Sequence, residues 1–263
     1  MQEFKKNNLN LNNLFINTRY LLDIKDNIDS LTAEYYLDDK NNNISNIYTC
    51  HEGLLLDYES ALTRIDKESN QYYCLSAELL WIGERTNNLY EAHIEFFKGI
   101  SNPIGIKVSL RTNINQLITS INLINPFNEE NKIILITRLG VLNNSEELLI
   151  KYVKELCNVI KKNGLNVIFV CDPMHGNTEV FKSKFKIRKI DNLIKEINLT
   201  NNILIDNGFE LGGIHFESTP LNVTECLDSK FCLDVIEEKY TSLCDPRINV
   251  YQATNIIDNI NIK

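Results

Sequence analysis

The stretch Ile133-Ile-Leu-Ile-Thr-Arg138 is a short apolar run that ends in a charged residue. The next segment, Ser145-Glu-Glu-Leu-Leu-Ile-Lys-Tyr-Val-Lys-Glu-Leu-Cys-Asn-Val-Ile-Lys-Lys162, places its apolar residues at helical spacing. A second short run, Val167-Ile-Phe-Val-Cys171, follows. A short buried run, an amphipathic helix and another short run predict two parallel strands joined by a crossover helix.

The same alternation of short apolar runs and helical segments recurs along most of the chain from about residue 72. Short apolar runs, each leading into a polar cluster, lie at 72–83, 104–109, 133–138, 167–171, 213–217 and about 240–244. Successive run ends are 28 to 45 residues apart, counted between Lys107, Arg138, Asp172, Glu217 and Asp245. This pitch predicts an α/β fold with a parallel sheet, either a barrel or a doubly wound sheet.

The residues at the run ends favour the barrel. They are charged or potentially catalytic: Glu84, Arg85, Lys107, Arg138, Asp172, His175, Glu217 and Asp245. In a (β/α)8 barrel all strand ends open onto one face, whereas a doubly wound sheet brings together only those at its switch point. Only about six βα units are visible, so we expect an incomplete TIM-type barrel.

The predicted organisation is one structural domain with two parts. Residues 1–70 are expected to form a helical N-terminal segment, because 8–35 and His51 to Arg64 have helical spacing. Residues 71–263 are expected to form the barrel portion with the active site. The strands ending at Glu84 and Asp245 would then be the sheet edges, covered by residues 1–50 or by another subunit.

The composition excludes several classes of protein. The chain has 263 residues, 43% of them hydrophobic and 24% charged, with a formal net charge of −8, so a nucleic-acid surface is not expected. No stretch approaches the ~18 to 20 apolar residues of a membrane span, and the first residues are too polar for a signal peptide. We therefore expect a cytoplasmic protein. Its seven cysteines are odd in number and contain no Cys-x-x-Cys pair, which argues against a disulfide framework or a zinc ribbon.

Three residues at successive run ends form a candidate metal site. A neutral imidazole with two carboxylates, as His175, Glu217 and Asp245 would supply, suits a divalent ion of the Mn, Fe or Co type. The ordinary alternative is a hydrogen-bonded histidine and two acidic loop caps. That alternative is preferable for any one of the residues alone, but not for three at successive strand ends.

Three cations form a candidate anion pocket. Arg85, Lys107 and Arg138 would all face the mouth of an otherwise acidic protein and bind a phosphate and a carboxylate. Salt bridges on exposed helix surfaces are the alternative. Trp81, the only tryptophan, is better explained as a core residue than as a ligand platform.

Several motifs carry a resemblance to a known family. They are Cys171-Asp-Pro-Met-His-Gly-Asn-Thr178, His51-Glu-Gly-Leu-Leu-Leu-Asp-Tyr-Glu59, Trp81-Ile-Gly-Glu-Arg-Thr86, Asn102-Pro-Ile-Gly-Ile-Lys-Val108, Gly212-Gly-Ile-His-Phe-Glu217, Asn222-Val-Thr-Glu-Cys226 and Cys244-Asp-Pro-Arg-Ile-Asn249. Residues 48 to 260 resemble type II (plant-type) 3-deoxy-D-arabino-heptulosonate 7-phosphate (DAHP) synthase, the first enzyme of the shikimate pathway, which leads through chorismate to the aromatic amino acids.

The resemblance implies a role for each of the candidate residues. It implies that His175, Glu217 and Asp245 hold a divalent metal, with Mn²⁺ expected and Co²⁺ or Fe²⁺ as alternatives. It implies that phosphoenolpyruvate is bound by Glu84, Arg85, Lys107 and Arg138, and it gives catalytic roles to Lys107, Arg138 and His175. The implied reaction condenses phosphoenolpyruvate with erythrose 4-phosphate and releases phosphate.

Departures from the family pattern leave two hypotheses open. Members of the family carry two earlier βα units with a fourth metal ligand, a cysteine, and this sequence does not contain them. Within the matched region, Lys107-Val-Ser-Leu110, Arg138-Leu-Gly-Val141 and Glu217-Ser-Thr-Pro-Leu221 differ from the expected loops. One hypothesis is a working synthase in which rearranged N-terminal helices or a second chain replace the missing units, the second chain being either a copy in a homo-oligomer or a complementing chain. The other is a degenerate, non-catalytic paralogue or partial subunit that keeps a metal or phosphate site.

Overall fold

The computed structural model describes residues 48–181, 185–228 and 239–261. Residues 48–263 form one compact unit. The helices expected between residues 8 and 35 lie outside the described residues.

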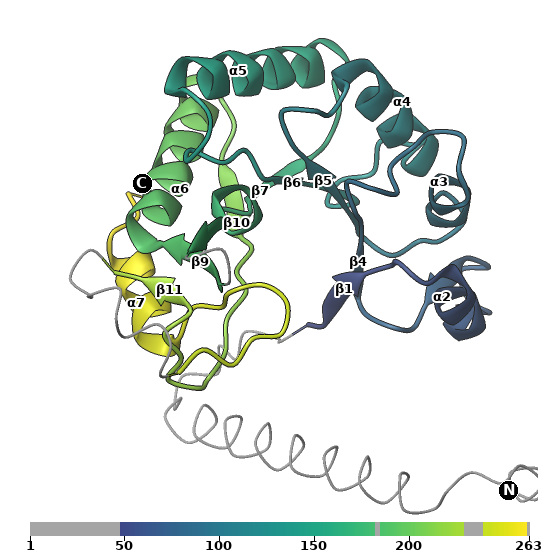
Figure 1. Ribbon diagram of the computed structural model, residues 1–263. Coiled ribbons are helices and arrows are strands. Elements are labelled where there is room, and N and C mark those ends of the chain that lie inside the picture. The colour runs from purple at the N-terminus through teal and green to yellow at the C-terminus, as the bar shows by residue number, and fades with distance from the viewer. Residues whose placement is uncertain (1–47, 182–184, 229–238, 262–263) are drawn as a thin grey trace, which may run out of the picture. The chain divides into compact units, whose positions relative to one another are not determined.

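A six-stranded parallel sheet forms the centre of this unit (Figure 1). Its strands, in spatial order, are β1 (Cys50–Glu52), β4 (Leu79–Ile82), β5 (Ile104–Val108), β6 (Ile133–Thr137), β7 (Ile168–Cys171) and β10 (Leu211–Ile214). Every neighbouring pair is parallel, and the spatial order follows the chain order. A doubly wound sheet would reverse its order at a switch point, so this sheet is wound in one direction as a barrel is. The predicted α/β class with six parallel strands is confirmed.

Crossover helices cover one face of the sheet. They are α3 (Ala92–Phe97), α4 (Ile114–Ile124), α5 (Glu146–Lys162) and α6 (Ile190–Asp206), and Figure 1 shows α3, α4, α5 and α6 around the outside of the strands. All residues of β5 and β6 are buried, as continuous apolar runs predict for central parallel strands. The apolar faces of α4 and α5 pack into the same core.

The sequence explains where α5 begins and ends. The Ser145 side chain caps its first turn by accepting a hydrogen bond from the amide of Leu148 at 3.3 Å. Acidic residues occupy the first turn and lysines the last turn, which matches the helix dipole. Gly164 then takes a left-handed conformation with φ of 60°, which ends the helix. The helix predicted at 145–162 is confirmed.

Smaller elements flank the sheet. A hairpin pairs β2 (Thr63–Ile65) with β3 (Tyr72–Cys74), and a three-stranded sheet contains β8 (Glu179–Phe181), β9 (Phe185–Lys189) and β11 (Cys226–Leu227). The remaining helices are α2 (Leu56–Leu62), the short 3-10 helix η2 (His175–Asn177) and α7 (Val250–Asp258).

The structure corrects the predicted first and last elements. The expected helix from His51 to Arg64 is instead β1, α2 and β2 in succession, because residues 50–52 pair with β4 and helix formation is delayed to Leu56. The expected strand at 240–244 is absent from the described residues there: they form a bend in which Leu243 is fully exposed, so that run contributes no buried core.

The sheet edges and the strand count follow from these corrections. The sixth strand is β1, which lies within the segment expected to be helical, and the edges are β1 and β10 rather than the strands expected at Glu84 and Asp245. The run at 72–83 also divides into β3 and β4, because residues 75–78 form a turn between them.

Candidate active site

The polar residues of interest follow the carboxyl ends of the sheet strands. Glu84 and Arg85 follow β4, Lys107 lies in β5, and Arg138 follows β6. Asp172 and His175 follow β7, and Glu217 follows β10. Because parallel strands in one sheet present these ends at the same rim, residues more than a hundred positions apart meet there.

A buried ion pair forms the centre of the site. The Lys107 ammonium lies 2.5 Å from Asp172 Oδ2, and the Asp172 side chain is fully buried. Asp172 also accepts hydrogen bonds from the amides of Met174 and His175, and His175 Nδ1 lies 2.8 Å from Oδ2. Burial by itself raises the pKa of Asp172, but the hydrogen bond from His175 and the Lys107 charge outweigh it and hold that pKa far below its usual range. Asp172 therefore stays ionised and fixes the His175 ring.

The three predicted metal ligands come together at this rim. One donor atom each from His175, Glu217 and Asp245 lie within 4.8 Å of one another, and all three side chains are half-buried. His175 Nε2 is 3.2 Å from Glu217 Oε1. Because His175 Nδ1 is held by Asp172, Nε2 is the nitrogen left to face a metal. A metal-binding histidine commonly makes such a hydrogen bond to a carboxylate through its other ring nitrogen, which fixes the orientation of the ring. The donor set of one imidazole and two carboxylates fits a Mn, Fe or Co ion.

Protonation of His175 is coupled to these carboxylates. Burial lowers the pKa of His175, but hydrogen bonds with Asp172 and Glu217 and their negative charges outweigh it and raise that pKa to about 9. A bound cation would replace this proton, so metal and proton compete for the same nitrogen.

Two cations on β9 were missed in the sequence. Lys186 Nζ lies 2.7 Å from Asp245 Oδ1, and the Arg188 guanidinium pairs with Glu217. Arg188 also donates to the carbonyl of Pro246 and, at 2.9 Å, to the Thr178 hydroxyl. Its side chain is fully buried, and its Nη2 has no hydrogen-bond partner among the described residues. Arg188 therefore ties together the loops that carry Glu217 and Asp245.

The signal for this pair lay in the pattern of the segment. Phe185-Lys-Ile-Arg-Lys189 alternates apolar and charged residues, so Lys186 and Arg188 share one face of a strand. A buried cation such as Arg188 needs an acidic partner, and the acids that pair with Arg188 and with the exposed Lys186 are two of the expected metal ligands.

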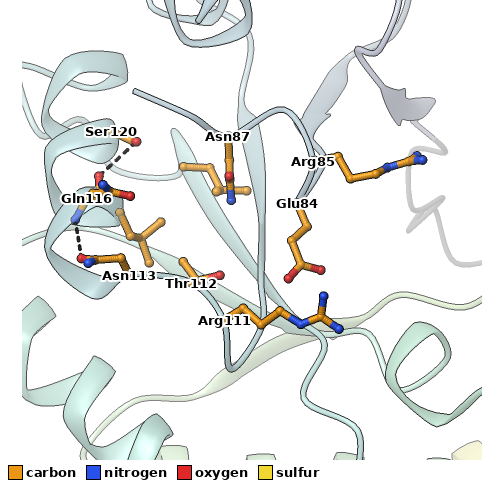
Figure 2. Close-up of a pocket in the computed structure, with 10 residues that line it drawn as sticks. Glu84, Arg85, Asn87, Arg111, Thr112, Asn113, Gln116 and Ser120 are labelled. Atoms are coloured by element: carbon orange, nitrogen blue, oxygen red, sulfur yellow. Dashed lines mark hydrogen bonds between the residues drawn. The ribbon is translucent and has the colours of Figure 1, made fainter. Parts of the chain in front are cut away.

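The predicted anion pocket is brought together only in part. Arg138 Nη1 lies 3.5 Å from Glu84 Oε2, and Ser109 also donates a hydrogen bond to Glu84. Arg138 and His175 line one cavity of about 400 Å³. Figure 2 shows the Arg85 side chain extending away from the Glu84 side chain, whereas Arg138 pairs with Glu84.

Trp81 and His215 form an aromatic wall beside Lys107. The Lys107 ammonium lies 5.5 Å from the centre of the Trp81 ring, and the rings of Trp81 and His215 meet edge to face with centroids 5.0 Å apart. Burial, with the nearby Lys107 charge, lowers the pKa of His215 to about 4, so this histidine is neutral at pH 7. Trp81 is half-buried and its ring contacts Lys107, whereas the sequence favoured a core residue at this position.

Two glycines and one buried acid hold the neighbouring loops together. A side chain at Gly140 would bring its Cβ within 2.4 Å of the Gly176 carbonyl oxygen, so the loops after β6 and β7 are in direct contact. Glu196, buried on α6, accepts hydrogen bonds from the amides of Leu139 and Gly140 and from the Asn177 side chain. This packing fixes the loop of Arg138 against the loop of His175.

The sequence is similar to one protein family. The profile of the Class-II DAHP synthetase family matches residues 12–261. A Neurospora crassa phospho-2-dehydro-3-deoxyheptonate aldolase is 37% identical over 236 residues, covering 83% of this chain and 48% of that protein. A Streptomyces coelicolor protein of the same name is 37% identical over 211 residues, covering 80% and 46%. A Catharanthus roseus protein named as a probable, chloroplastic form is 36% identical over 211 residues, covering 80% and 40%.

This chain spans about half the length of the curated relatives that it matches. Among the described helices, none is long and apolar enough to cross a membrane.

Proposed function

Because this chain belongs to the Class-II DAHP synthetase family, we propose that it catalyses the DAHP synthase reaction, with phosphoenolpyruvate and erythrose 4-phosphate as substrates. The proposal assigns the metal to His175, Glu217 and Asp245, with Mn²⁺ as the expected ion. The observation that carries it is the meeting of these three donors beside the buried Lys107–Asp172 pair.

The proposed phosphoenolpyruvate site consists of Lys107, Arg138 and Glu84, with Arg85 as a further member by family resemblance. Phosphoenolpyruvate carries a phosphate and a carboxylate, and the two cations would neutralise charge on both. Arg138 supplies a planar pair of N–H donors, and Glu84 orients it from 3.5 Å. Asp172 keeps Lys107 in place, so this cation is held ready before the substrate arrives.

The reaction forms one carbon–carbon bond and exchanges phosphate for water at C2. Carbon C3 of phosphoenolpyruvate attacks the aldehyde carbon of erythrose 4-phosphate, and water adds at C2 of the phosphoenolpyruvate unit. Inorganic phosphate then leaves by cleavage of its C–O bond, which yields the C2 carbonyl. Of the two protons of the water, one ends on the former aldehyde oxygen and the other leaves with the phosphate. When bound, the divalent metal would supply Lewis-acid polarisation of the aldehyde. His175, held by Asp172, would stay fixed throughout.

A second candidate is a non-catalytic chain or partial subunit that keeps the same site. The observation that favours it is the open sheet, since among the described residues β1 and β10 each pair on one side only. Exposed strand edges need a cover, so we propose that a homo-oligomer or a complementing chain supplies it. Cytoplasmic location is likewise our proposal, although the Catharanthus roseus relative is named chloroplastic.

An activity assay separates the two candidates. The purified chain, with Mn²⁺ and both substrates, should release phosphate and form the heptulosonate in equal amounts, and Arg138→Ala should reduce the rate at least tenfold, since an Arg–phosphate contact contributes about 1.5 to 3 kcal/mol per hydrogen bond. The exposed Lys98→Ala, whose partner is Glu95, is the control. Absence of turnover by the chain, with the other chains of its source added, would favour the non-catalytic candidate.

A further inference from the structure

The loop that carries Asp245 has little structure or burial of its own. Residues 241–247 contain neither a helix nor a strand, and Pro246 is the only one of them that is buried. Leu243 is fully exposed, so the largest apolar side chain of the loop adds nothing to the core. A segment with few buried apolar contacts keeps one shape only where polar contacts fix it.

Glu225 is the centre of the polar contacts that hold this loop. Its side chain is fully buried. Oε1 accepts hydrogen bonds from the amides of Thr241 at 3.0 Å and Ser242 at 2.8 Å, and from the Thr241 hydroxyl at 3.2 Å. Oε2 accepts from the amide of Arg247 at 2.8 Å. One carboxylate therefore joins the first and last residues of the loop, and Asp245 lies between them.

The Arg247 side chain binds the same carboxylate with two nitrogen atoms. Nε donates to Oε2 at 3.0 Å and Nη2 donates to Oε1 at 2.8 Å, and Nη2 also donates to the Thr241 hydroxyl at 2.8 Å. Burial raises the pKa of Glu225, but the hydrogen bonds from the Arg247 side chain and from the loop amides outweigh it and lower that pKa to about 2. Glu225 is therefore ionised at pH 7 and can accept all of these hydrogen bonds.

Glu225 is itself held in place by α7. Val223 and Cys226, on either side of it in the chain, are buried. The Asn249 side chain donates to the carbonyl of Val223 at 3.0 Å, and the Gln252 side chain donates to the carbonyl of Cys226 at 2.8 Å. Asn249 and Gln252 also form the capping box that begins α7. The carboxylate therefore has a position that does not depend on the loop it binds.

The loop connects this carboxylate to the metal site. Ser242 Oγ donates to the backbone carbonyl of Asp245 at 2.6 Å. Ser242 and Arg247 line one cavity of about 420 Å³ together with Glu217 and Asp245. One donor atom of Asp245 lies within 4.8 Å of donor atoms of His175 and Glu217. A shift of the loop would separate the Asp245 carboxylate from the other two ligands.

We propose that Glu225 is a positioning residue of the metal site, which holds residues 241–247 in the shape that presents the Asp245 carboxylate to the ion. This inference rests on the metal site of the proposed function and deepens it, since Glu225 is not one of the three donors. A purely structural Glu225 would stabilise the fold without any particular effect on the metal. The two roles differ in whether metal affinity depends on Glu225 or only on the stability of the fold.

The test is an electron paramagnetic resonance titration of free Mn²⁺ with the full chain and with Glu225→Gln. Glutamine keeps the size of the side chain but places an NH₂ group where one oxygen accepts N–H donors, so one end of the loop loses its partner. Mn²⁺ affinity should fall at least about tenfold, since loss of a residue that supports a metal ligand costs about 10- to 100-fold. Ser242→Ala, a milder change that removes the hydroxyl bonded to the Asp245 carbonyl, should weaken it about fivefold.

The matched control is Glu59→Gln. Glu59 is likewise a buried carboxylate, with hydrogen-bond partners at His51, Cys74 and Ser76. None of these residues belongs to the metal site, so the Mn²⁺ affinity of this variant should stay within about twofold of wild type. Urea unfolding without metal gives the stability of every variant, and Ser242→Ala carries the test if Glu225→Gln does not fold.

A double substitution shows whether Glu225 acts through Asp245. In Asp245→Asn the loop no longer carries the carboxylate that Glu225 would position, so adding Glu225→Gln should change the remaining Mn²⁺ affinity by less than about twofold. The titrations extend to millimolar Mn²⁺, so that weakened sites are measured as well. A further loss of about tenfold would mean that Glu225 acts on the site by another route, and would overturn the proposal.

The outcomes also separate this inference from the proposed function. Wild-type Mn²⁺ affinity in Glu225→Gln, or equal losses in Glu225→Gln and Glu59→Gln, would overturn the positioning role and leave the metal site of the proposed function in place. Absence of Mn²⁺ binding by wild type would count against that metal site, and the inference would fall with it. A chain that shows the predicted binding pattern but no turnover would count against the synthase reaction alone.

Discussion

Replacing Lys107 by methionine should be among the most damaging single changes in the sheet. Met matches the length of the lysine stem but removes the ammonium that lies 2.5 Å from the Asp172 carboxylate. Asp172 is fully buried and Lys107 is 5% exposed, so water cannot replace the lost partner without opening the rim.

The expected magnitude follows from what Asp172 retains. Removing one partner of a buried ion pair costs about 3 to 5 kcal/mol, because the other charge stays buried without compensation. Asp172 keeps hydrogen bonds from the amides of Met174 and His175 and from the His175 ring. We therefore expect the lower end, a loss of about 3 kcal/mol in the free energy of unfolding.

Urea unfolding of the full chain measures this loss, and a double-mutant cycle isolates the pair. Asp172→Asn removes the charge that Lys107→Met leaves unpaired, so the double variant should be less destabilised than the sum of the single variants by about 2 kcal/mol. The control is Lys98→Met, which breaks the exposed Lys98–Glu95 pair and should cost less than about 0.5 kcal/mol. A loss of less than about 1 kcal/mol in the free energy of unfolding for Lys107→Met would refute the reasoning. So would a double variant whose loss equals the sum of the losses of the two single variants.

Three further predictions concern other parts of the unit. Gly140→Ala should lower the free energy of unfolding by more than about 2 kcal/mol, since φ is 77° and the new Cβ would meet the Gly176 carbonyl. Gly164→Ala, where φ is 60° and the space is open, should lower it by only about 1 kcal/mol in the same chemical unfolding series. Equal losses for the two variants would contradict the close contact at Gly140. Arg188→Lys should weaken Mn²⁺ binding about tenfold in an electron paramagnetic resonance titration, because lysine cannot hold the loops of both acidic ligands, and unchanged affinity would contradict that role. Burial lowers the pKa of Lys132 to about 8, so the unfolded state binds more protons than the folded state between about pH 8 and 10.5. In that window Lys132 therefore makes the free energy of unfolding rise with pH by up to about 1.4 kcal/mol per pH unit. Lys132→Met should lack this rise, and identical pH slopes for variant and wild type would contradict the prediction.

The centre of the fold was predictable because its signals are local. The runs that become β5, β6 and β7 are continuous and apolar, and α5 carries its own cap, charge pattern and terminating glycine. The edge strand β1 was not predictable in this way. Its three residues, Cys-His-Glu, have no apolar pattern, and they are extended because they pair with β4.

The candidate site shows the same division. His175, Glu217 and Asp245 were singled out in the sequence because chemically distinctive residues recur at run ends, and their donor atoms lie close together. No strand directly precedes Asp245 among the described residues, so a loop rather than a strand end places that carboxylate.

The alternation of residues 185–189 could place Arg188 on a strand face, but its partners Glu217 and Pro246 lie 29 and 58 positions away and come close only in the folded chain. Glu196 has no such local signal, since its partners lie 19 to 57 positions away. A charged residue in a short strand or in the middle of a helix is usually solvated, and burial reverses that expectation.

The most direct test of the account is the binding of Mn²⁺ by the full chain, measured by electron paramagnetic resonance titration of free ion. The account predicts one bound ion per chain, with binding strongly weakened in His175→Gln and in Asp245→Asn and unchanged in Glu95→Gln, whose exposed carboxylate lies on α3. A chain that binds no Mn²⁺ stoichiometrically, or one whose binding survives both ligand substitutions, would contradict it.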